Sequence, residues 1–301
     1  MGGSQSKNVG LVQNVSVEHK RKVEPLLRAN HKHGIILDKK PREVSLISQS
    51  LAAACLLEVQ PTSALFDLWD KLAINTVDIT DSEEEIVETD YLSPDCLGHE
   101  DQYTRLLYSH TSCTKQYLQV EQVIDGLLAR QGWGLRNLAY ATEMGSKDMC
   151  TEALGGALSF YEPLQPNAAA TRPVPQSDAA LLHARDEIVD AALSQEDVKL
   201  STVSDLVVLN SLCVLWQYLS QPHFAKLWNH VTGGLRGSEA PITTTTTTGQ
   251  QEQSSIDQDH AWSAIIRGVC EAQPKYLPEL RLLRDHPRFG LQVARNLFNS
   301  N

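Results

Sequence analysis

Apolar residues recur at three- and four-residue spacing along most of the chain, which is the pattern of amphipathic helices. From Arg42, the residues Val44, Ile47, Leu51 and Ala54/Cys55 define one such face. Further faces are predicted within 65–69, 117–128, 181–193, 206–219 and 262–270. Strand-like alternation is confined to 74–79. The sequence therefore predicts an all-α protein, irregular or repeat-like because no fixed period relates its segments.

Glycine and proline set the expected helix limits. A short first helix is expected to start near Pro25 and to stop at Gly34. Helical structure over 133–160 is expected to break around Gly145 and again at 155–156. Ser177 is expected to cap one helix, and Ser204 to open the most apolar helix, which ends before Pro222.

Two segments of biased composition predict the domain organisation. Residues 162–177 contain four prolines and predict an exposed linker. Residues 232–258 contain Thr243–Thr248 and predict a disordered loop. The expected order is an N-terminal arm over 1–42, a helical subdomain over 43–161, the linker, and a second helical subdomain over 178–301.

Charge is distributed unevenly along the chain. The formal net charge is −11, so the surface as a whole should repel nucleic acid, and no nucleic-acid partner is expected. Residues 1–42 nevertheless carry nine Lys/Arg against three acids, which makes this flexible arm basic. Residues 78–101 contain ten acids and predict a solvated acidic loop, or alternatively a partner site. Ser82 precedes three glutamates and is a candidate phosphorylation site for an acid-directed kinase.

The opening heptapeptide MGGSQSK fits the acceptor pattern for N-myristoylation. Removal of Met1 would expose the amine of Gly2, which is the acylated group. Gly3 is small and uncharged, Ser6 stands where a hydroxyl is favoured, and Lys7 follows it. The sequence therefore predicts a lipid anchor at Gly2, recognised through Gly3, Ser6 and Lys7.

One myristoyl chain binds a membrane only marginally, so a second signal is expected. The basic arm is the candidate, because each cation near an anionic bilayer contributes about 1 kcal/mol. The acceptor pattern, basic stretch and helical body resemble, in arrangement, the membrane-binding matrix domains of retroviral structural proteins. The resemblance covers the first few dozen residues. The anchor and the basic arm themselves predict a peripheral protein on a cytoplasmic membrane face, bound to anionic lipid. The cations expected to meet the lipid are Lys20, Arg21, Lys22, Lys39, Lys40 and Arg42.

The sequence lacks the common motifs of catalytic chemistry. The chain contains no GxSxG, HExxH, GxxxxGK[ST] or GxGxxG pattern, and its six cysteines lack zinc-site spacing. We therefore expect no catalytic residue, no metal and no cofactor. The sequence favours a non-enzymatic adaptor or regulatory protein that binds an unidentified protein partner at a membrane. The alternative is a cytosolic enzyme with an unrecognised helical active site.

Overall fold

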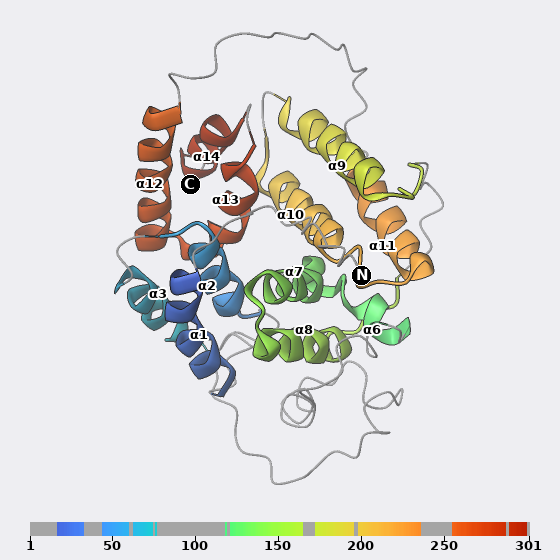
Figure 1. The fold of residues 1–301 in the computed structure, drawn as a ribbon, viewed down its shortest axis with the longest axis horizontal. Coiled ribbons are helices and arrows are strands. Elements are labelled where there is room, and N and C mark those ends of the chain that lie inside the picture. Colours follow the sequence, from blue (N-terminus) through green and yellow to red (C-terminus); the bar gives the residue numbers. More distant parts are fainter. Residues whose placement is uncertain are drawn as a thin grey trace, which may run out of the picture.

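The computed structural model describes residues 17–32, 44–59, 63–74, 76, 118, 121–164, 172–195, 198–235, 255–286 and 289–299. Helices and their connections make up these parts of the chain, so the predicted all-α class is confirmed (Figure 1). In chain order the elements are α1 (Val17–Lys32), α2 (Ile47–Leu56), α3 (Ser63–Ala73), α6 (Glu121–Gly126), α7 (Ala129–Met144), α8 (Lys147–Ser159), α9 (Asp178–Leu193), α10 (Leu200–Val214), α11 (Gln221–Gly234), α12 (Ser255–Ala272), the 3₁₀ turn η2 (Pro274–Tyr276), α13 (Leu277–Arg284) and α14 (Gly290–Asn299).

Helix α2 lies at the centre of the fold. It packs against α1, α3, α7 and α13, and all ten of its residues are buried rather than only the one face that the spacing predicted. Its polar side chains find partners inside the protein: Gln49 Nε2 donates to the carbonyl oxygen of Trp133 at 3.1 Å, and the Ser50 hydroxyl donates to that of Pro274 at 3.4 Å. Buried polar groups need such partners, and these bonds hold α2 against α7 and η2.

Helix α1 begins at Val17, eight residues before the predicted start, and Pro25 lies inside it. Proline lacks the N–H that an interior helical position donates, so packing must offset its cost. The buried side chains recur at helical spacing and contact α2 and α8; they are His19, Val23, Leu26, Leu27 and Asn30. Residues 17–32 of the range expected to be a flexible arm therefore form a helix packed on the body.

Helices α7 and α8 form an antiparallel pair joined at Gly145, whose φ of 70° suits glycine and ends α7 as predicted. The second predicted break is wrong, because α8 runs through 155–156. A Cβ at Gly156 would lie 2.1 Å from the Trp133 ring, so glycine here makes room for the indole. Trp133 is buried, and its Nε1 donates to the carbonyl oxygen of Ser45 at 2.8 Å.

Helix limits in the second half follow the predictions in part. Ser177 caps α9, because its hydroxyl accepts from Ala180 N at 3.3 Å. Helix α10 begins at Leu200 rather than at Ser204. Helix α11 was not predicted; it contains Pro222 in its first turn, where a missing N–H costs nothing.

One cluster of buried apolar side chains extends from Val23 to Leu297. Helices of the first and last parts of the chain meet in it, since α2 packs against α13 and α3 against α12 (Figure 1). The two regions predicted as subdomains thus share one core. Of the predicted linker, residues 165–171 lie outside the described residues, as do 236–254 of the predicted loop and the acidic segment 78–101.

Buried ion pairs join α7 to α13. Arg281 pairs with Glu143 and lies over the Tyr140 ring, 4.9 Å from its centroid. Arg136 pairs with Glu279 at 3.6 Å. Burial alone would lower the pKa of Arg281, but the Glu143 carboxylate outweighs it and raises that pKa. Removing either partner of such a pair leaves a charge buried without compensation.

Candidate functional site

A groove of about 560 Å³ lies between α1 and the turn that joins α7 to α8. We call it the α1–α8 groove. One of its walls comes from positions of α1 that share a face of the helix, and the other from the consecutive residues of the turn. The lining residues are Val17, Lys20, Arg21, Glu24, Leu27, Arg28, Met144, Gly145, Ser146, Lys147 and Asp148.

The groove is cationic although the protein is acidic. Four Lys/Arg and two acids line it, against a net charge of −11 for the chain. Lys20 Nζ donates to the carbonyl oxygen of Glu143 at 2.7 Å, and Arg28 pairs with Glu24 at 2.9 Å. Arg21 and Lys147 are exposed and pair with no residue that the structure describes. Two cations therefore remain available to a ligand.

The first turn of α8 is part of the second wall of the groove. Ser146 is its N-cap and accepts a hydrogen bond from Met149 N at 3.3 Å. The N–H groups that begin a helix lack intrahelical acceptors and favour negative charge. Asp148 lies in the same turn, and its negative charge offsets part of this positive field.

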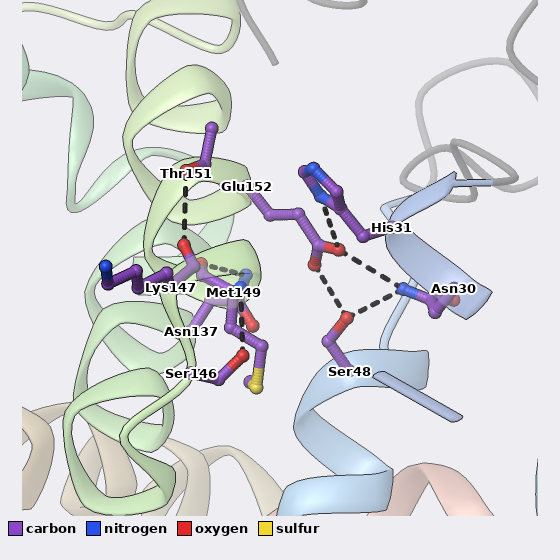
Figure 2. A network of polar contacts seen from close by, with 9 residues as sticks. All are labelled: Asn30, His31, Ser48, Asn137, Ser146, Lys147, Met149, Thr151 and Glu152. Carbon is purple, nitrogen blue, oxygen red and sulfur yellow. Dashed lines mark hydrogen bonds and ion pairs between the residues drawn. The ribbon is translucent and has the colours of Figure 1, made fainter. Parts of the chain in front are cut away.

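A buried polar network joins α1 to α2 and α8 close to this groove (Figure 2). Glu152 is at its centre and only 2% exposed. One carboxylate oxygen accepts from the Ser48 hydroxyl at 2.6 Å, and the other lies 3.5 Å from both Asn30 Nδ2 and His31 Nδ1. Asn30 Nδ2 also donates to the Ser48 hydroxyl oxygen at 2.8 Å. Three helices are thus tied together through one carboxylate.

The network sets the charge of His31. Burial would lower the pKa of this imidazole, but the hydrogen bond to Glu152 and the carboxylates of Glu152 and Asp148 outweigh it and raise the pKa. His31 Nδ1 thus faces a carboxylate that favours the protonated form of the imidazole. This pair holds the C-terminal part of α1 in place and so fixes the wall of the groove.

The same network could be considered as a nucleophile with its base, because it joins Ser, His and Glu. Its geometry differs from that arrangement, in which the imidazole faces the hydroxyl. Here the hydroxyl of Ser48 donates directly to the carboxylate, and His31 Nδ1 faces the same carboxylate. Ser48 is 6% exposed, and none of the four residues lines the groove. The arrangement fits a structural tie.

Burial lowers the reactivity of three cysteine thiols. Burial raises the pKa of Cys55 and of Cys213 to about 12 and that of Cys270 to about 11. Because the thiolate is the nucleophile, these cysteines are unreactive near neutral pH. Within the described parts of the chain, no group of three or more His, Cys, Asp or Glu side chains is placed to hold a metal.

The structure separates the predicted lipid-binding cations. Lys20 and Arg21 line the groove, whereas Lys22 lies outside it and pairs with Glu18 at 3.1 Å. The predicted site residues Gly2, Gly3, Ser6, Lys7, Lys39, Lys40, Arg42 and Ser82 lie outside the described residues.

Sequence reasoning did not single out Arg28 or Lys147. Arg28 follows Lys20 and Arg21 by eight and seven residues, so an earlier helix start would have placed it on their face. Lys147 comes from a distant part of the chain and carried no local signal. It joins the site only because α8 packs against α1.

Comparison with protein-family models and with curated proteins gave no match. Among the described helices, none combines the length and the apolar composition that a bilayer-crossing segment requires.

Proposed function

We propose that this chain is an N-myristoylated peripheral membrane protein of a cytoplasmic membrane face. Gly2 carries the acyl group, and the cations near the N-terminus supply the electrostatic part of membrane binding. The helical body binds a protein partner as an adaptor or regulatory subunit.

The observation that carries the proposal is the position of the α1–α8 groove relative to the acceptor pattern. The segment that starts MGGSQSK leads into α1 at Val17, and Val17 lines the groove. A single myristoyl group gives an association constant of only about 10⁴ M⁻¹, so stable anchoring needs a second signal. The groove lining begins fifteen residues after Gly2 in the sequence, so its cations can supply that signal from the folded body itself.

The charge of the remaining surface makes such a cluster necessary. With a net charge of −11, the chain as a whole would on average be repelled by an anionic bilayer. Exposed Arg21 and Lys147 place two unpaired positive charges in one groove. Within about 10 Å of the bilayer surface, these charges attract anionic lipid with little screening by salt.

Two apolar side chains favour a protein partner for the body. Phe66 on α3 is 52% exposed, and Ile74, directly after this helix, is 70% exposed. Contiguous exposed apolar surface marks interaction sites, and these two side chains come from one helix and the residue directly after it. They are the positions at which we expect partner contact.

Cell fractionation of a Gly2→Ala variant tests the proposal. We expect the parent chain in the membrane fraction and Gly2→Ala in the supernatant, because alanine is not an acceptor. Gly3→Ala is the matched control: it is an equally small change next to the acylated residue, and it should fractionate like the parent. Equal membrane association of Gly2→Ala and the parent would refute the lipid anchor.

A further inference from the structure

The α1–α8 groove differs from an ordinary charged surface in its shape. Its volume of about 560 Å³ lies within the 300–1,000 Å³ range of ligand pockets. Lys20, Arg21 and Arg28 recur at helical spacing on α1, and Lys147 faces them from the start of α8. Cations from two elements thus surround one hollow, which a solvated helix face does not require.

The groove also holds its cations in defined positions. The bond from Lys20 Nζ to the Glu143 carbonyl directs this ammonium group and leaves further N–H donors on it. Glu24 is neutralised by Arg28 at 2.9 Å, and Asp148 is the remaining acid in the lining. The buried Glu152 network fixes the helix that carries three of the four cations.

We propose that the α1–α8 groove binds a membrane-lipid headgroup that carries phosphate monoesters. A monoester bears close to two negative charges at neutral pH, so it gains more from clustered cations than the single charge of a phosphodiester does. The guanidinium of Arg21 can bind phosphate oxygens in bidentate fashion, Lys147 adds a point charge, and the first N–H groups of α8 add donors. The apolar side chains of Val17, Leu27 and Met144 complete the lining beside these groups.

This inference rests on the proposed function for its choice of a lipid over a soluble anion. After removal of Met1, the fifteen residues before Val17 reach at most about 55 Å when extended. An acyl group at Gly2 would therefore keep the groove close to the bilayer, which raises the effective concentration of headgroups at the groove.

A soluble headgroup tests the groove without the anchor. Inositol trisphosphate is titrated calorimetrically into the full chain carrying Gly2→Ala, with inorganic phosphate as the second ligand. The groove pair Arg21→Gln/Lys147→Gln is compared with the control pair Arg172→Gln/Lys199→Gln, which removes the same charge from exposed positions outside the groove. Thermal unfolding establishes that both pairs are folded.

We expect the groove pair to bind inositol trisphosphate roughly 30-fold more weakly than the parent, and the control pair to bind within about twofold of it. Equal affinities of the groove pair and the control pair would overturn the proposal. It would also be overturned if inorganic phosphate bound as tightly as the headgroup, or if an acidic phosphopeptide bound the groove while the headgroup did not.

Vesicles then separate this inference from the proposed function. The myristoylated chain is sedimented with phosphatidylcholine vesicles that contain either phosphatidylserine or a phosphatidylinositol bisphosphate, at equal total lipid charge. We expect the groove pair to lose more binding than the control pair on both vesicles, and to lose more on the bisphosphate than on phosphatidylserine. If the groove pair of an acylated chain lost binding equally on both kinds of vesicle, the groove site would be refuted and the lipid anchor would be unaffected. Groove-dependent headgroup binding by a chain that is never acylated would refute the anchor alone.

Discussion

The pair of His31 and Glu152 allows a quantitative test of how α1 is held. A double-mutant cycle with His31→Gln and Glu152→Gln isolates their coupling from the other bonds of Glu152, which are lost in both arms of the cycle. His183 and Glu187 on α9 provide a matched control, because their nearest atoms are also 3.5 Å apart. The side chains of the control pair are 74% and 49% exposed, against 14% and 2% for His31 and Glu152.

Coulomb's law gives the expected difference. At an effective dielectric constant of about 20, opposite charges 3.5 Å apart attract by about 4.7 kcal/mol, and desolvation of His31 offsets part of this. We expect a coupling of about 1.5 kcal/mol for the buried pair at pH 6. In water the same distance gives about 1.2 kcal/mol before salt screening and side-chain entropy, so the control pair should couple by about 0.3 kcal/mol.

The pH dependence fixes the sign. The pKa of His31 is raised by folding, so its contribution is fully present below the unfolded-state pKa of about 6.5 and is lost as pH rises through the folded-state value. Urea unfolding of the four chains of each cycle at pH 6 and pH 9 measures both couplings. A buried coupling no larger than that of His183 and Glu187, or one that grows toward pH 9, would refute this account of α1.

Three further predictions concern the core. Gly156→Ala should lower the free energy of unfolding by about 2 kcal/mol in urea, because its Cβ would meet the Trp133 ring, whereas Gly234→Ala, with nothing within 4 Å of its Cβ, should be neutral or stabilising; equal effects would contradict this packing. Arg281→Ala should cost about 3–5 kcal/mol in the same assay by leaving Glu143 buried without its partner, and a loss below about 1 kcal/mol would argue against the pair. When native protein is treated with iodoacetamide at pH 8, peptide mass spectrometry should show no alkylation of Cys55, Cys213 and Cys270, all of which should be labelled in denaturant. Rapid labelling of these thiols in the native protein would contradict their burial.

The helices that the sequence located well have apolar faces and local caps. Ser177 with the apolar positions 181–193 located α9, since both signals act within one element. Helix α1 was placed too late because Pro25 was interpreted as a first-turn residue, and because its buried face includes the polar residues His19 and Asn30, which interrupt the apolar pattern. Their burial depends on partners in other helices, such as Ser48, and a single sequence does not display these partners.

Two helix limits predicted from glycine and proline were wrong for a related reason. The Gly155–Gly156 dipeptide was interpreted as a break, but Gly156 serves the packing of Trp133 inside a continuous helix. Pro222 was interpreted as the end of one helix, whereas it lies in the first turn of the next, behind the Ser220 cap. Each residue has two structural uses, and only the tertiary surroundings decide between them.

Among the residues that line the groove, only two were predicted site residues. Lys20 and Arg21 were predicted from the basic stretch as cations that meet lipid, and the structure places both in the lining of the groove. The position of Lys147 opposite them could not be predicted from the sequence, since it follows from the packing of α8 against α1. The buried ties of Glu152 to Ser48 and His31, which create that docking, join parts of the chain about a hundred residues apart.

The most direct test of the lipid anchor is the intact mass of the protein expressed with and without N-myristoyltransferase, followed by sedimentation with anionic vesicles at low and high salt. We predict the mass of one myristoyl group on Gly2 only with the transferase, and vesicle binding that weakens as salt screens the groove cations. An unmodified Gly2 in the presence of active transferase would contradict the account, and so would vesicle binding by the acylated chain that does not change with salt.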